Sequence, residues 1–419
     1  MHRLFALIVL FPLVGPISST AQEEMLLHPR ATGQGVVLTK VADQLAFPIG
    51  MTPLPDGSLL VATSPSATGN FFASTGELVR LFDTDGDGSL DDRRTLAGDL
   101  PGSLVAVARS GNLVIATSAQ GGNEQIMFFR RGERWRDPLI PVETIRLHFQ
   151  GALHQSYALA TRPNPDDAAA FDLVFNIGAA GYDAGGSDVG FDGIISGTLA
   201  PSSLYLMTVI VNGDRIDFGE PIQIATGLRN ASALAFHPES GDLWIGENGI
   251  DGLDNPIVAF SADELNVIPA ARIGTEMVDF GFAEAYINYA SGDVIGDESH
   301  AVAFRPIAGS EAEGIAGIVF VPGSFPADLA GGILAGFHGQ FDLTGIANEE
   351  NPVRWVNVET SEQFHLISND SVAIGHLDSM TATDDAIYIA DFCNASMTSS
   401  EACGVIYRLT TEQSANAPG

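Results

Sequence analysis

Lysine and helical periodicity are both scarce in this chain of 419 residues. Lys40 is the only lysine, and 19 basic residues stand against 52 acidic ones, for a formal net charge of −33. Such an acidic surface repels phosphate backbones and anionic headgroups, which excludes nucleic acid and anionic membranes as partners. Helical periodicity is limited to single turns at 261–266 and 359–364. The sequence therefore excludes a helical bundle.

Cysteine is equally scarce. Two cysteines, Cys393 and Cys403, are too few for a cysteine-based zinc site or an iron–sulfur cluster. In an exported protein, two cysteines so close together predict a disulfide that closes a surface loop. The alternative is a pair of free thiols.

The first residues predict export. A short basic start leads into the apolar run Leu4–Ile17, and small residues follow up to Ala21, where we expect cleavage. The alternative is a membrane anchor, but the run is short for a span and contains Pro12 and Pro16. No later segment is apolar enough to span a membrane. We expect a secreted or periplasmic protein.

One pattern recurs about six times along the chain. It consists of a small-residue entry, an alternating apolar strand, a turn with Asp or Gly, and a second strand that ends in small residues. The copies lie at Phe47–Thr63, Gly102–Thr117, Ser156–Asn176, Ala233–Gly246, Gly317–Phe337 and Asp378–Ala390. Each copy is followed by a strand with polar alternation. The repeats predict an all-β, six-bladed β-propeller rather than a β-sandwich pair or a β-helix.

The repeats also divide the chain. We expect a signal peptide at 1–21, an N-terminal extension at 22–39, the propeller at 40–411 and a flexible tail at 412–419.

An acidic turn, Asp83–Asp92, has the spacing of a calcium loop. Asp83, Asp85, Asp87 and Asp91 stand at relative positions 1, 3, 5 and 9, with Gly88 at position 6. The glycine allows a sharp turn, so that alternating carboxylates converge on one hard cation. Arg94 takes the position of the usual bidentate glutamate. The loop predicts a structural Ca²⁺ site between two strands, with a solvated acidic hairpin as the alternative.

The stretch Gly227–Asn255 resembles the soluble glucose/sorbosone dehydrogenases, which are six-bladed propellers that use pyrroloquinoline quinone and Ca²⁺. Its Gly-Leu-Arg-Asn start and its His-Pro, Leu-Trp and Glu-Asn-Gly elements carry the resemblance. Asp263-Glu-Leu-Asn266 and Phe325–Gly339 are similar to two further segments of that family. The resemblance extends over about residues 40–410.

The resemblance implies an oxidoreductase that oxidises an aldose or a related sugar at the anomeric carbon and passes electrons to an external acceptor. Arg229 and Asn230 would bind the quinone, and the backbone carbonyls of Gly249 and Ile250 would hold Ca²⁺. His154, in Leu153-His-Gln-Ser-Tyr-Ala-Leu159, would be the general base. An imidazole suits that role because it can accept a hydroxyl proton near neutral pH.

The sequence departs from the family at the start of the last repeat. Gly375-His-Leu-Asp378 stands where the family has arginines that bind the carboxylates of the quinone. Two alternatives therefore stay open. One is a non-catalytic propeller that binds carbohydrate or protein. The other is a Ca²⁺-dependent, lactonase-type hydrolase with a metal held by Glu247, Asn248 and Asp251.

Overall fold

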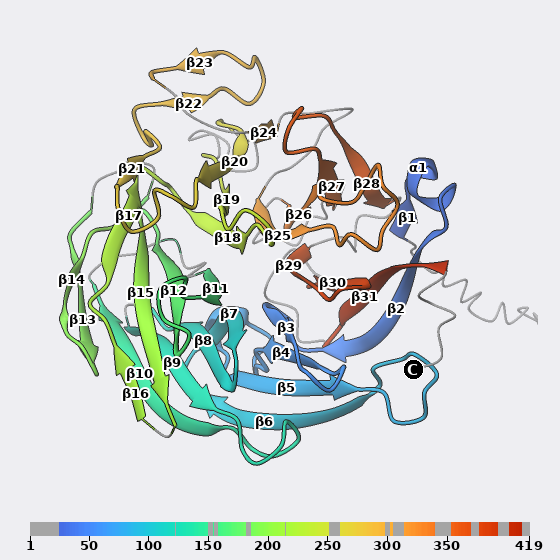
Figure 1. The fold of residues 1–419 in the computed structure, drawn as a ribbon, viewed down its shortest axis with the longest axis horizontal. Helices are drawn as coiled ribbons and strands as arrows, with labels where there is room; N and C mark the ends of the chain where they lie inside the picture. The colour runs from blue at the N-terminus through green and yellow to red at the C-terminus, as the bar shows by residue number, and fades with distance from the viewer. Residues whose placement is uncertain are drawn as a thin grey trace, which may run out of the picture.

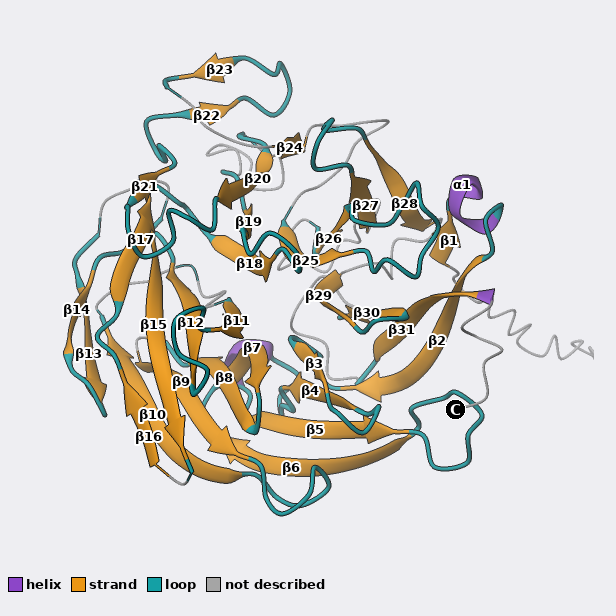
Figure 2. Ribbon diagram, viewed as in Figure 1, coloured by secondary structure: helices purple, strands orange, loops and turns teal. Residues whose placement is uncertain are grey.

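The computed structural model describes residues 25–121, 123–149, 154, 158–181, 186–213, 215–250, 260–297, 302–304, 314–339, 353–369, 377–392 and 402–412. These residues are mostly β-strands, arranged as six sheets around a central axis (Figures 1 and 2). The predicted six-bladed β-propeller is confirmed. Among the described residues the helices are α1 (Pro29–Thr32) and the 3₁₀ helix η1 (Phe71–Ala73), and neither could cross a membrane.

Blades 1 to 3 begin one after another along the chain, although β13 and β14 join the outer edge of blade 2 from between the strands of blade 3. Blade 1 contains β3 (Met51–Pro53), β4 (Leu59–Thr63), β5 (Gly76–Phe82) and β6 (Asp92–Leu100). Blade 2 contains β7 (Ser103–Ser110), β8 (Leu113–Ala119), β9 (Asn123–Arg130), β10 (Ile140–His148), β13 (Val189–Gly193) and β14 (Gly197–Leu199). Blade 3 contains β11 (Leu159–Pro163), β12 (Ala170–Ile177), β15 (Ser203–Asn212), β16 (Arg215–Phe218), β17 (Ile222–Thr226) and β21 (Val278–Asp279).

Blades 4 to 6 complete the ring. Blade 4 contains β18 (Ala231–Phe236), β19 (Leu243–Glu247), β20 (Asp263–Ile268) and β24 (Val302–Phe304), and β22 (Tyr286–Ile287) and β23 (Val294–Ile295) form a separate projecting hairpin. Blade 5 contains β25 (Ile315–Phe320), β26 (Ile333–Phe337), β27 (Val353–Val356), β28 (Gln363–Asn369) and β1 (Met25–Leu27). Blade 6 contains β29 (Leu377–Ala382), β30 (Ala386–Asp391), β31 (Gly404–Thr411) and β2 (Val36–Leu45).

The second strand of every blade is buried along its whole length. These strands are β4, β8, β12, β19, β26 and β30. Their sequences are runs of apolar and small residues, such as Ala386-Ile-Tyr-Ile-Ala-Asp391. A strand that is covered on both faces needs no polar alternation, which is why these runs are continuous. By contrast, the outer strand β6 has exposed residues at about half of its positions.

The core is divided among the interfaces between blades. Six hydrophobic clusters each join one pair of neighbouring blades, including the pair 6 and 1 that closes the ring. Each fully buried Leu, Ile or Phe contributes about 1.5–3 kcal/mol relative to exposure. A single blade cannot bury both of its faces, so each cluster forms only when two neighbouring blades pack together, and the one between blades 6 and 1 only when the ring closes.

The ring closes through the N-terminal segment. Strand β2 pairs antiparallel with β31, from Val36 opposite Thr411 to Leu45 opposite Gly404. Strand β1 adds to the outer edge of blade 5 by pairing with β28. Residues 25–39, which the sequence analysis assigned to an extension outside the propeller, therefore contribute strands to two blades.

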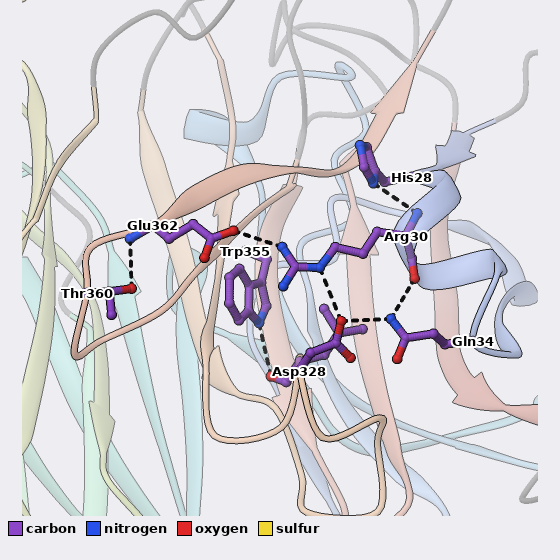
Figure 3. A network of polar contacts seen from close by, with 8 residues as sticks. His28, Arg30, Gln34, Asp328, Trp355, Thr360 and Glu362 are labelled. Carbon is purple, nitrogen blue, oxygen red and sulfur yellow. Dashed lines mark hydrogen bonds and ion pairs between the residues drawn. The ribbon is translucent and has the colours of Figure 1, made fainter.

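Arg30 binds helix α1, which lies between β1 and β2, to blade 5 (Figure 3). Its guanidinium forms ion pairs with Asp328 at 3.2 Å and Glu362 at 2.9 Å, and its Cζ lies 5.2 Å from the Trp355 ring centroid. Gln34 donates a hydrogen bond to the same Asp328 carboxylate at 2.8 Å. These contacts hold the segment that leads into the closing strand.

The inner strands β3, β7, β11, β18, β25 and β29 surround a cavity of about 1030 Å³ on the axis of the ring. All six run in the same direction because each begins a new blade. We call the face where they begin the entry face; it carries Gly50 before β3, Asn230 before β18 and Gly314 before β25. Long connections gather at this face.

One local expectation is wrong. The stretch 261–266, for which the sequence allows a helical turn, contributes the first part of strand β20. Its residues pair with β19 on one side and β24 on the other. Tertiary pairing within blade 4 overrides the weak local signal.

Candidate functional site

The turn Gly227–Asn230 places two predicted site residues at the entry face, just before β18. Gly227 has a φ of 69°, and a Cβ there would lie 2.3 Å from an Asp279 carboxylate oxygen. Only glycine fits this left-handed, tightly packed position. The next residues, Arg229 and Asn230, are each only 7% exposed. The Gly-Leu-Arg-Asn sequence therefore buries an arginine at the entry face.

His154 lies against the end of β12. Its backbone N–H donates to the Ala179 carbonyl at 3.0 Å. A Cβ on Gly178 would lie 2.6 Å from the His154 carbonyl oxygen, so this glycine allows the close approach. The ring atom Nε2 of His154 is buried and has no hydrogen-bond partner among the residues that the structure describes. A buried polar atom without a partner is costly and marks a place where a ligand or water can bind.

The pKa of His154 is lowered to about 4. Burial is the largest cause, the positive charge of Arg229 is the second, and a backbone hydrogen bond with Gly181 acts in the opposite direction. The imidazole is therefore neutral at physiological pH. Because Nε2 is the ring nitrogen without a partner, it is the one that is open to accept a proton.

The backbone and the side chain of Arg229 are both held by hydrogen bonds. Its backbone N–H donates to the Glu247 carboxylate at 2.6 Å, and its Nη1 donates to the Gly249 carbonyl. Its own carbonyl accepts from Ala179 N–H at 2.7 Å. Arg229 therefore links the strand end that positions His154 to the loop that carries Gly249.

Asp263, on β20, extends this chain of contacts into blade 5. One carboxylate oxygen accepts from Gly249 N–H at 2.7 Å, and the other accepts from Gly314 N–H at 2.6 Å and Ile315 N–H at 2.7 Å. Burial raises the pKa of Asp263, while the three N–H donors and Arg229 oppose that rise. Both oxygens act as acceptors, which is the arrangement of an ionised carboxylate.

Asn230 belongs to a second, parallel chain of contacts. Its side-chain amide donates to the Asn248 side-chain oxygen at 2.7 Å, and the Asn248 amide donates to the Ile315 carbonyl at 2.6 Å. The structure thus brings His154, Arg229, Asn230 and Gly249 together across blades 3 to 5.

The residues fit the quinone that the resemblance implies. A planar quinone needs a base and a cation, and the described residues supply both: the imidazole nitrogen of His154, which has no partner among them, and the buried guanidinium of Arg229. These two groups are the part of the implied cofactor site that the described residues supply.

The two carbonyls predicted to hold Ca²⁺ differ in the number of hydrogen bonds that they already accept. Within the described chain the Gly249 carbonyl accepts only from Arg229, which leaves one lone pair for an ion. The Ile250 carbonyl accepts from Phe260 N–H at 2.5 Å and Ser261 N–H at 3.0 Å. A role for Ile250 as a ligand, which stays a prediction, requires the loss of one of these bonds.

The Glu247 carboxylate accepts hydrogen bonds from two residues of the site. Besides the Arg229 N–H, its carboxylate accepts from the Asn266 side chain at 3.0 Å. A lactonase-type metal would need the same oxygens. Among the residues that the structure describes, no group of three His, Cys, Asp or Glu side chains converges at the entry face.

The acidic turn lies away from the entry face, between β5 and β6. Asp83, Asp85 and Asp87 place one carboxylate oxygen each within 4.8 Å of one another, and Asp91 is outside this group. The Asp83 carboxylate accepts backbone N–H groups of Gly88, Gly86 and Asp85, which lower its pKa. Ca²⁺ binding here stays a prediction with three ligands in place of four.

Several predictions fall outside the described residues. These are the signal peptide, Cys393 and hence the disulfide with Cys403, Asp251, and the Gly375-His376 departure. The sequence analysis passed over Asp263 as a site residue, although its Asp-Glu-Leu-Asn segment carried part of the resemblance.

No protein-family model and no curated protein sequence matches the chain. Solved structures do. They include the holo form of the pyranose dehydrogenase PQQ domain from Coprinopsis cinerea, with 12% identity, a TM-score of 0.57, and coverage of 93% of this chain and 97% of that one. A calcium structure of a Trichoderma reesei carbohydrate-active enzyme of family AA12 has 15% identity, a TM-score of 0.59, and coverage of 93% and 97%. The PQQ-bound aldose sugar dehydrogenase from Streptomyces coelicolor has 17% identity, a TM-score of 0.54, and coverage of 90% and 99%. The chain has the fold of these sugar dehydrogenases over nearly its whole length.

Proposed function

We propose that this protein is an exported, quinone-dependent sugar dehydrogenase that oxidises an aldose at the anomeric carbon to a lactone. The observation that carries the proposal is the neutral His154 imidazole, whose buried Nε2 has no partner beside a buried arginine. These groups belong to a fold that sugar dehydrogenases share.

Each of the protein's own site residues has a separate role in this reaction. His154 Nε2 accepts the proton of the anomeric hydroxyl as the hydride leaves the same carbon. Arg229 supplies positive charge where negative charge develops on the acceptor, and Asn230 binds beside it. The Gly249 carbonyl, with Ile250 next to it, would hold Ca²⁺. Bound pyrroloquinoline quinone would supply the two-electron acceptor, and Ca²⁺ a Lewis acid that polarises it. An external acceptor must then remove the electrons.

The low pKa of His154 has one effect that favours its role as a base and one that opposes it. A base that titrates near 4 is already deprotonated at neutral pH, so activity needs no prior deprotonation step. Its driving force as a base is weaker than that of an unperturbed imidazole. Departure of the hydride from the anomeric carbon makes the attached hydroxyl more acidic, which compensates for the weaker base.

Reconstitution tests the proposal. The mature protein is titrated with pyrroloquinoline quinone and Ca²⁺, binding is followed by absorbance, and dye reduction is measured over a panel of aldoses. We expect binding and turnover in the wild type and a loss of about 10²–10⁴-fold in turnover for His154→Ala. His148, an exposed histidine paired with Asp192 on blade 2, supplies the matched control His148→Ala, which should stay active.

Two results would contradict the proposal. Absence of quinone binding at saturating Ca²⁺ would leave a propeller without the cofactor. Equal turnover in His154→Ala and His148→Ala would remove His154 from the reaction. N-terminal sequencing of protein recovered outside the cytoplasm tests export separately, with Gln22 expected as the first residue.

A further inference from the structure

We infer that Asp263 is the positioning residue of the site: its carboxylate holds Gly249 and the start of blade 5 so that the Gly249 carbonyl and Arg229 face the bound quinone. The inference rests on the proposed function. Asp263 is 2% exposed, and it touches neither the sugar nor the acceptor in this role.

The geometry of the three amides supports this role. One belongs to the loop that follows β19, and two belong to the start of β25 and the residue before it; all three lie 2.6–2.7 Å from the carboxylate. Without an acceptor, three buried N–H groups would lack partners, and the two segments would have to move apart to reach water. A carboxylate can accept from all three because it offers two oxygens and donates nothing.

Gly249 transmits the position of Asp263 to Arg229. Its N–H donates to Asp263 and its carbonyl accepts from Arg229 Nη1, so the two peptide groups that flank its Cα join the carboxylate to the guanidinium. A Cβ on Gly249 would lie 2.3 Å from the Ser261 carbonyl oxygen, which shows how closely the loop packs on β20. A shift of the Gly249 peptide therefore shifts the contact of Arg229.

The contacts then continue toward the base. The Arg229 carbonyl accepts from Ala179 N–H, and the Ala179 carbonyl accepts from His154 N–H. Asp263 lies at the blade 5 end of this chain and His154 at the blade 3 end. The Asp263 charge also reduces the net positive charge that Arg229 presents to its surroundings.

The test compares two buried aspartates. Asp263→Asn replaces one acceptor oxygen by an amide donor, which repels an N–H that the carboxylate accepted. Asp172→Asn is the matched control, because Asp172 is also 2% exposed and accepts from Arg162 and Asn164 at the other end of blade 3. Both variants are measured for thermal unfolding, for the Kd of pyrroloquinoline quinone with Ca²⁺, and for hydrogen–deuterium exchange without ligand.

We expect both variants to lose stability, but only Asp263→Asn to weaken quinone binding, by about 10–100-fold, as for other groups that orient ligand-binding atoms. Exchange at Gly249, Gly314 and Ile315 should become faster in Asp263→Asn and stay unchanged in Asp172→Asn. Asp263→Ser, which leaves room for water, replaces Asp263→Asn if that variant does not fold, with the same expected results.

The two failures are distinguishable. If the wild type does not bind the quinone, the proposed function fails, and exchange in the ligand-free protein still decides whether Asp263 holds the two segments. If the wild type binds and Asp263→Asn keeps both the wild-type Kd and slow exchange at Gly249, the positioning role is wrong. An equal loss of affinity in Asp172→Asn would also overturn it, because the effect would then follow stability and not the site.

Discussion

Acidification should destabilise this protein through His154, and the size of the effect follows from its pKa. The folded-state pKa of about 4 lies below the ordinary value of 6.5. Between these values the unfolded chain binds a proton that the native protein does not, so stability falls as pH decreases from about 6.5 to about 4. Each pKa unit corresponds to about 1.4 kcal/mol, so the full contribution is about 3 kcal/mol.

Urea unfolding at pH 7 and pH 4.5 measures this effect in the wild type and in His154→Gln, which cannot titrate. Other groups contribute equally to both proteins, so the difference between them isolates His154. We expect the wild type to lose about 2–3 kcal/mol more than the variant between the two pH values. An NMR titration of the His154 ring should give the same pKa directly. Equal losses in both proteins, or a His154 that titrates above pH 6, would refute the reasoning.

Three further predictions concern Arg30, the acidic turn and the loop that carries Gly249. Arg30→Ala should lower the free energy of unfolding in denaturant titrations by about 1–2 kcal/mol, because it removes two ion pairs and the stacking on Trp355; a similar loss in the exposed control Arg215→Ala would contradict this. Asp85→Asn should abolish Tb³⁺ luminescence at the turn while Asp91→Asn retains it, and the reverse order would exclude the grouping seen here. Gly249→Ala should destabilise by about 1–3 kcal/mol in thermal unfolding and weaken quinone binding, because its Cβ would meet the Ser261 carbonyl; a wild-type Kd would show that the loop can adjust.

The fold was predictable because the repeats carry two kinds of signal. Continuous apolar runs such as Leu113–Ala119 mark the doubly covered second strands, and the turns around them recur with each blade. The closing strands carry no such signal. Strands β1 and β2 pair with partners more than 300 residues away, and no local pattern near Met25 or Val36 indicates that contact.

The site was predictable only in part. His154, Arg229 and Gly249 came from a resemblance, and the structure joins them through backbone carbonyls that no sequence pattern identifies. Asp263 was overlooked because its role depends on three amides, one from a preceding loop and two from a following blade. A carboxylate that binds backbone looks the same in sequence as one that faces solvent.

The pairing of β2 with β31 also sets the order in which this chain can mature during synthesis. Residues 36–45 leave the ribosome first, but their partners at 404–411 are translated almost at the end. Until then β2, the outer strand of blade 6, has no β31 to pair with, and β1 has no partner until β28 is made. Such an unpaired edge is a template for pairing with another chain. A fusion partner that obstructs residues 25–45 should therefore reduce the yield of native protein more than one attached to a surface loop.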